Sequence, residues 1–188
     1  MEVSRPMEAR ARPSSAPVAL DREDRILRAA AVFFVLAVLF HNSDHARRGG
    51  TSVTTDVFWI GGLALVLEVG IVALIFMRHR DAPLAAVAVG FVLALGYIFV
   101  HFTPHRAWLS DTFIVGRPAL MSRIAASLEV AAALVLGFAG LFVFRRRRAE
   151  PREGGAISLT ETLLHPAVAS MALGNLVIFI LVVSSRYG

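Results

Sequence analysis

Long apolar runs separated by short polar stretches dominate the pattern of this chain. The runs cover about residues 26–45, 57–77, 84–102, 119–144 and 166–185. Each run is close to the roughly 20 residues that an α-helix needs to cross a bilayer. The pattern therefore predicts an all-α integral membrane bundle with five transmembrane helices, formed by residues 25–188 as a single domain.

The first 24 residues break this pattern, because they have no hydrophobic period and are rich in Arg, Pro, Ser and Ala. A segment of this composition buries too little apolar surface to fold by itself. We predict a disordered cytoplasmic tail over residues 1–24. No small-x-small cleavage site follows the first apolar run, so we expect that run to remain in the protein.

Composition supports the membrane assignment and narrows the chemistry. The 188 residues are 56% hydrophobic, with a mean hydropathy of +0.66. The chain has no cysteine, and all 19 of its basic residues are arginine. Disulfides, thiolate metal ligands, cysteine nucleophiles and Schiff-base lysines are therefore excluded. The arginines flank apolar runs, so we expect membrane lipids as partners and no nucleic acid. A membrane-protein partner or a homo-oligomer is compatible with this composition.

Arginine is distributed unevenly between the two sides of the predicted bundle. With five spans the termini lie on opposite sides, and the side of the N-terminus would carry thirteen of the nineteen arginines. Short cytoplasmic segments of membrane proteins are enriched in basic residues. We therefore predict a multi-pass protein of the cell (inner) membrane with its N-terminus in the cytoplasm.

Two histidine clusters end the first and third runs. His41, Asp44 and His45 share one helical face because they are three and four residues apart. His101 and His105 end the third run, which would cross the membrane in the same direction as the first. Both clusters are thus expected at the outer face. Imidazole and carboxylate donors without sulfur favour zinc, iron, manganese or copper.

Two carboxylates inside the apolar runs point to the same region. An ionised carboxylate in hydrocarbon costs about 2.5–3.5 kcal/mol, so such residues usually face the interior of a bundle. Glu129 shares its helical face with small residues, which allow close helix approach. These residues are Ala125, Ala126, Ala132 and Ala133. We expect Glu129 to contact the first or third run and to join the metal ligands.

Three further residues are candidates for supporting the centre. Asp111 follows the second cluster and could ligate the metal or orient a ligand. Tyr97 lies one turn before His101 on the same helical face, and Glu68 lies deeper in the second run. Glu68 would be reached through water or Tyr97, as part of a proton path.

Other interpretations of these residues remain open. The histidines could be ordinary helix-end residues, with Asp44 as a counter-charge to Arg47 or Arg48, in a non-catalytic membrane subunit held together by a polar layer. His41 and His101 could instead be axial ligands of a b-type haem. His79 and His165 are interpreted as ordinary interfacial residues. The buried glutamates would also suit a transport path, although no internal repeat supports one.

The patterns His-x-x-Asp-His at 41–45 and His-x-x-Pro-His-x-x-x-x-Ser-Asp at 101–111 carry one resemblance. They resemble those of small uncharacterised polytopic membrane proteins of GC-rich bacteria. The resemblance implies a bacterial inner-membrane location, and it implies no particular reaction or substrate.

Overall fold

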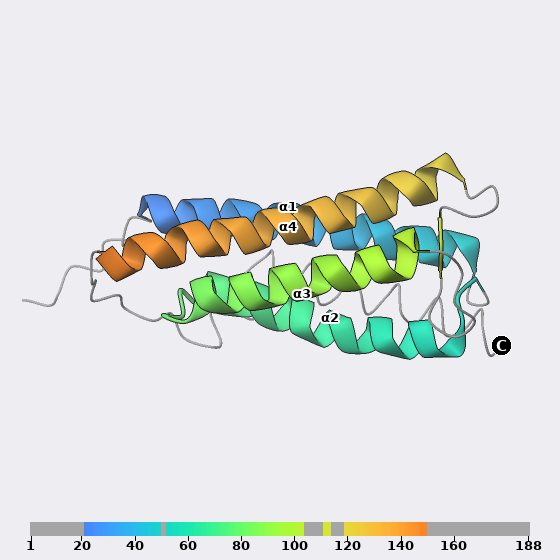
Figure 1. Cartoon of the computed structure of the whole chain (residues 1–188), viewed down its shortest axis with the longest axis horizontal. Coiled ribbons are helices and arrows are strands. Elements are labelled where there is room, and N and C mark those ends of the chain that lie inside the picture. The colour runs from blue at the N-terminus through green and yellow to red at the C-terminus, as the bar shows by residue number, and fades with distance from the viewer. Residues whose placement is uncertain (1–20, 50–51, 104–110, 114–118, 150–188) are drawn as a thin grey trace, which may run out of the picture.

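Four long helices make up almost all of the part of the chain that the computed structural model describes, which is residues 21–49, 52–103, 111–113 and 119–149. They are α1 (Arg22–Arg48), α2 (Thr55–Phe76), α3 (Ala82–Phe102) and α4 (Leu120–Ala149). The helices alternate in direction along an elongated bundle (Figure 1). All four are long and apolar enough to cross a membrane. The all-α prediction is confirmed for these four, and the predicted fifth span, 166–185, lies outside the described residues.

Polar residues fix where the helices begin and end. The Asp21 carboxylate accepts a hydrogen bond from the Asp24 amide and caps α1, and Thr54 does the same for Val57 at the start of α2. Such caps satisfy amide groups that have no partner in the first turn of a helix. Gly49, with φ of 88°, ends α1 in a conformation that glycine adopts without strain.

The beginning of α1 corrects the predicted boundary of the tail. Glu23 and Asp24 are buried in the first turn of α1, within the 24 residues predicted to be disordered. Asp24 forms ion pairs with Arg78 and Arg147, and Glu23 forms one with Arg146. The hydropathy pattern did not predict this turn, because its charged residues lower the local hydropathy. Residues 1–20 lie outside the described residues.

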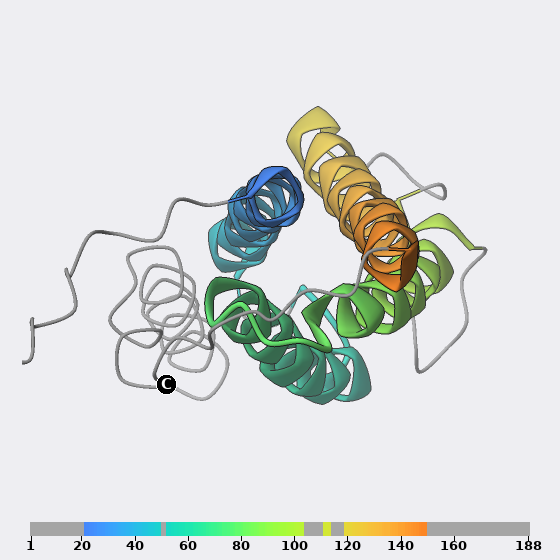
Figure 2. The same cartoon turned by 90° about the vertical axis from the view of Figure 1, so that its left-hand side faces the viewer.

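The helices follow one another around the bundle in the order α1, α4, α3, α2 (Figure 2). Helices α3 and α4 pack most closely, because glycine lies at their contacts. A Cβ atom on Gly90 would lie 2.6 Å from the backbone nitrogen of Gly137, and one on Gly140 would lie 2.7 Å from the Pro83 carbonyl oxygen. Helix α2 packs more loosely and diverges from α3 beyond their connecting turn (Figure 1).

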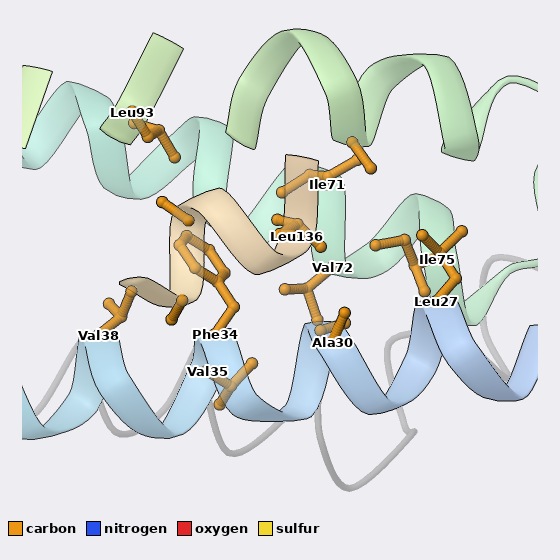
Figure 3. Close-up of a cluster of buried hydrophobic side chains, with 14 of the residues drawn as sticks. Leu27, Ala30, Phe34, Val35, Val38, Ile71, Val72, Ile75, Leu93 and Leu136 are labelled. Carbon is orange, nitrogen blue, oxygen red and sulfur yellow. The ribbon is translucent and has the colours of Figure 1, made fainter. Parts of the chain in front are cut away.

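An apolar core fills one part of the bundle and ends where the polar site begins. Phe34, Val38, Val72, Leu93 and Leu136 bring α1, α2, α3 and α4 into this core (Figure 3). In α1 the next buried residue after Val38 is His41. We call the end of the bundle beyond this point, where α1 and α3 finish, the histidine end, and the opposite end the arginine end.

Candidate metal centre

Three histidine side chains converge at the histidine end. The ring of His41 lies 4.6 Å from that of His45 and 4.8 Å from that of His101, centroid to centroid. One nitrogen from each of the three rings lies within 4.8 Å of the other two. The two clusters that the sequence places on one side are thus in contact, and the three rings form a group that could hold a metal ion.

Glu129 of α4 brings a carboxylate to the same point. Its Oε2 atom lies 3.5 Å from Nε2 of His41 and 4.0 Å from Nε2 of His101. Glu129 is buried, and the predicted small face of α4, from Ala125 to Ala133, is buried with it. Glu129 therefore faces the bundle and approaches both the first and the third helix, as the sequence predicts.

The hydrogen bonds of Arg48 determine the protonation of two imidazoles. Arginine only donates, so its Nη2 atom, 3.0 Å from Nδ1 of His45, makes that nitrogen an acceptor. A neutral His45 then carries its proton on Nε2. That nitrogen lies 2.9 Å from Nε2 of His41 and donates to it. His41 consequently holds its own proton on Nδ1, which is buried and has no partner among the described residues.

His101 is oriented from the other side. Its Nδ1 atom lies 3.1 Å from the backbone carbonyl oxygen of Asp111 and must donate to it. The lone pair of His101 is therefore on Nε2, the nitrogen that faces Glu129. A backbone carbonyl is one of the common partners for the second nitrogen of a metal-bound histidine, and it fixes both the tautomer and the ring orientation.

A short segment following α3 holds that carbonyl in place. The amides of Asp111 and Phe113 donate to the carbonyls of Val100 and His101, which are among those that the end of α3 leaves without a helical partner. The Phe113 ring stacks on His101 with centroids 5.1 Å apart and an angle of 7° between the planes. The segment 111–113 thus caps α3 and covers one face of His101.

Asp44 occupies a different role from the predicted one. Both of its carboxylate oxygens are bound by arginine: Oδ1 by Arg47 at 2.6 Å and Oδ2 by Arg48 at 3.0 Å. The alternative interpretation, a counter-charge to these arginines, describes its contacts. These contacts do not support a ligand role for Asp44. The spacing of three residues that suggested a pairing with His41 also separates Asp44 from Arg47, and Asp44 binds the guanidinium group of Arg47.

Arg48 connects the two halves of the site. Besides His45 and Asp44, it binds both carboxylate oxygens of Asp111, at 2.9 and 2.8 Å. That carboxylate also lies 3.7 Å from Nδ1 of His101 and 3.8 Å from Nε2 of His45. The sequence indicated Arg48 only as a possible counter-charge to Asp44, and its contacts with His45 and Asp111 were not predicted. The signal for its role was its position four residues after Asp44, where the two side chains meet on one face.

A cavity of about 280 Å³ lies beside the centre. His41, His45, His101 and Glu129 line one part of it, and Glu68 lines another. The hydroxyl group of Tyr97 donates to Oε1 of Glu68 at 2.5 Å. The predicted proximity of Glu68 to Tyr97 is therefore seen, and both residues share the cavity with the centre.

The geometry suits a metal ion better than a haem. Two axial imidazoles of a haem stand on opposite faces of the porphyrin, whereas His41 and His101 meet edge to ring at 4.8 Å. Glu129 lies against both of them. Ligand nitrogens about 2.0–2.1 Å from a zinc ion lie about 3–4 Å apart, close to the separations present here. His105, predicted as a further ligand, lies outside the described residues.

No protein-family model, curated protein or solved structure matches the chain.

Proposed function

We propose that this protein is a multi-pass membrane protein that binds one divalent metal ion between α1, α3 and α4 and uses it for metal-dependent chemistry. The core ligands are Nε2 of His41, Nε2 of His101 and Oε2 of Glu129. His45 lies beside these three donors and becomes a fourth, weaker ligand only if its proton moves from Nε2 to Nδ1. Nitrogen and oxygen donors of this kind serve zinc, iron, manganese or copper.

One observation carries the proposal: when Glu129 is ionised, acceptor atoms from three helices face one another without a donor between Glu129 and the two imidazoles. The Nε2 atoms of His41 and His101 both present lone pairs, as their hydrogen bonds require. The Oε2 atom of Glu129 has no hydrogen-bond partner among the described residues. Burying an unpaired acceptor costs about 1–3 kcal/mol. A cation at the common point would satisfy Oε2 of Glu129 and Nε2 of His101, and it would replace the N–H group of His45 as the partner of Nε2 of His41.

Chemistry, rather than a purely structural role, is favoured by the cavity. Structural zinc sites are closed by four protein ligands, whereas catalytic sites use three and leave a position for water or substrate. Here the three core donors line a cavity that also contains a second carboxyl group, Glu68. A metal-bound molecule in this cavity would thus lie near a group able to accept or donate a proton.

We further propose that the histidine end faces the outside of the cell or the periplasm, in the inner membrane. The support is the arginine asymmetry of the sequence together with the alternating direction of the four helices. With the N-terminus in the cytoplasm, α1 and α3 end on the outer side, and both bring their histidines there.

Metal analysis of the detergent-purified protein tests the proposal. We expect about one metal ion per chain in the wild type, and loss of that metal in His101→Ala and Glu129→Gln with the helical circular dichroism retained. His79→Ala is the matched control, because His79 lies on the turn at the arginine end and is partly exposed. Metal-free wild type after supplementation with each candidate ion would reject the metal centre and leave a polar layer that joins the helices.

A further inference from the structure

The cavity beside the metal centre has properties that the metal does not explain. Its wall is largely apolar, with Val57, Leu65 and Leu93 among the lining side chains. Glu68, in contrast, lies in that wall 4% exposed, and its Oε2 atom has no hydrogen-bond partner among the described residues. A buried acceptor at the wall of an apolar cavity is the arrangement of a ligand pocket, where few polar groups fix the orientation of a mostly apolar molecule.

The cavity opens sideways between α2 and α3. Ile60 of α2 and Val92 of α3 line it and are 45% and 64% exposed, so the lining continues onto the outer surface of the bundle. Gly61 and Gly96, on the same two helices, also line it and are exposed. This surface is apolar, as expected for helices that face lipid. A ligand would therefore enter from the hydrocarbon of the membrane rather than from water.

Glycines widen the cavity at this opening. Cβ atoms built on Gly61, Gly62 and Gly96 would meet no other atom within 4 Å, although all three residues line the cavity. The missing side chains thus leave space rather than permit close helix packing, in contrast to Gly90. An apolar cavity of about 150 Å³ is sufficient to hold benzene. The roughly 280 Å³ available here holds a single ring with a short chain.

We propose that this cavity binds an uncharged, membrane-soluble molecule with a hydroxyl-bearing ring as its head group and an apolar tail that extends between α2 and α3. The hydroxyl group bonds to Oε2 of Glu68, and Tyr97 holds the carboxyl group in position through Oε1. A hydroxyl group both donates and accepts, so it suits Glu68 whether or not the carboxyl group is ionised. The head group then lies beside the metal centre.

Binding of radiolabelled 4-hexylphenol to the protein in phosphatidylcholine nanodiscs tests this proposal, with empty nanodiscs subtracted. We expect saturable binding at one site per chain. Hexylbenzene has the same shape without the hydroxyl group, and we expect it to compete at least tenfold more weakly. The measurement is made with metal and after chelation. Because the Glu68 contact does not need the metal, absence of metal rejects only the metal centre, and absence of saturable binding rejects only the ligand site.

Filling the cavity gives the decisive variants. Gly62→Leu and Gly96→Leu should each weaken binding at least tenfold, because the new side chain occupies the opening. Gly70→Leu is the matched control, since Gly70 lies in α2, does not line the cavity, and also has no atom within 4 Å of a built Cβ. Thermal unfolding of all three variants verifies the fold. Equal binding by the Gly62, Gly96 and Gly70 variants, or equal competition by hexylbenzene, would overturn the proposal.

Discussion

Arg48 determines which nitrogen of His45 carries the proton and, through His45, which nitrogen of His41 is unprotonated. For His45 to bind a metal through Nε2, its proton must move to Nδ1. The N–H group so formed would face a guanidinium N–H group at the present 3.0 Å separation. His101 meets no such obstacle, because the Asp111 carbonyl already accepts its Nδ1 proton. The three histidines are therefore unequal as ligands, although their spacing in the sequence does not distinguish them.

This inequality predicts a ranking of metal affinities. We expect His45→Ala to bind metal within about tenfold of wild type, since it removes a weak ligand and also frees Nε2 of His41. His101→Ala should lose more than about 100-fold, more than is typical for a residue that only supports a ligand. Competition titration with a chromogenic chelator measures both. A greater loss in His45→Ala than in His101→Ala would contradict the tautomer assignment.

Replacement of Arg48 tests the support of the site. Lysine keeps the charge but lacks the planar fork that binds both oxygens of Asp111, so Arg48→Lys should loosen the segment that orients His101. We expect metal affinity to fall about 10–100-fold, as for other partners of metal ligands. Arg47→Lys is the control, because Arg47 is 52% exposed and binds Asp44 on the side of Ser122. Equal effects of the two changes would assign Arg48 a general electrostatic role.

Sequence reasoning found the residues of the site more readily than their partners. The spacing of His41 and His45, together with the common direction of the first and third runs, was enough to predict that both lie near His101. The small residues around Glu129 were enough to predict that its side chain faces the interior of the bundle. Asp111 was predicted to ligate the metal or to orient a ligand, but the atom that contacts His101 could not be predicted, because it is a backbone carbonyl oxygen and every residue has one. The cavity was also missed, since it depends on the angle between α2 and α3.

At the scale of the helices, glycine has two opposite functions that the sequence alone does not separate. Gly90 and Gly137 let the α3 and α4 backbones approach each other, whereas Gly62 and Gly96 leave space beside α2 and α3. The apolar runs predicted the existence and the approximate ends of four helices, because bilayer-length hydrophobic runs are strong signals. They did not predict which helices are neighbours, since lipid-facing and partner-facing residues are equally apolar.

The close contact of α3 with α4 gives a prediction for stability. Gly90→Ala places a methyl group 2.6 Å from the Gly137 nitrogen and 2.8 Å from the Ala133 carbonyl oxygen, so the helices must separate. Overpacking of this kind costs about 1–3 kcal/mol. Gly70→Ala meets no atom within 4 Å, and alanine is favoured over glycine in a helix by about 0.5–1 kcal/mol. Thermal unfolding in detergent should therefore shift downward for the first and not for the second. A Gly90→Ala protein as stable as wild type would contradict the packing.

Across the whole molecule, the two ends of the bundle are held by different ionic networks. At the arginine end, Asp24 joins α1 to the turn after α2 and to α4 through Arg78 and Arg147. At the histidine end, Arg48 joins α1 to the segment after α3. The apolar core lies between them, which fits four helices that are long and apolar enough to cross a membrane. Each charged end is therefore suited to one membrane face.

The orientation of the molecule in the membrane follows from this charge distribution and is the prediction on which the location of the site depends. Short segments rich in arginine next to membrane spans usually stay on the cytoplasmic side. A reporter fused after Arg148, which follows the basic run at the end of α4, should be active only in the cytoplasm. A reporter in the loop 106–117 should be active only outside. Replacing 145–148 by glutamine should weaken this preference without changing the metal ligands, because the run lies at the opposite end of the bundle. The reverse pattern of reporter activity would place His41, His101 and Glu129 at the cytoplasmic face, and their metal would then come from the cytoplasm.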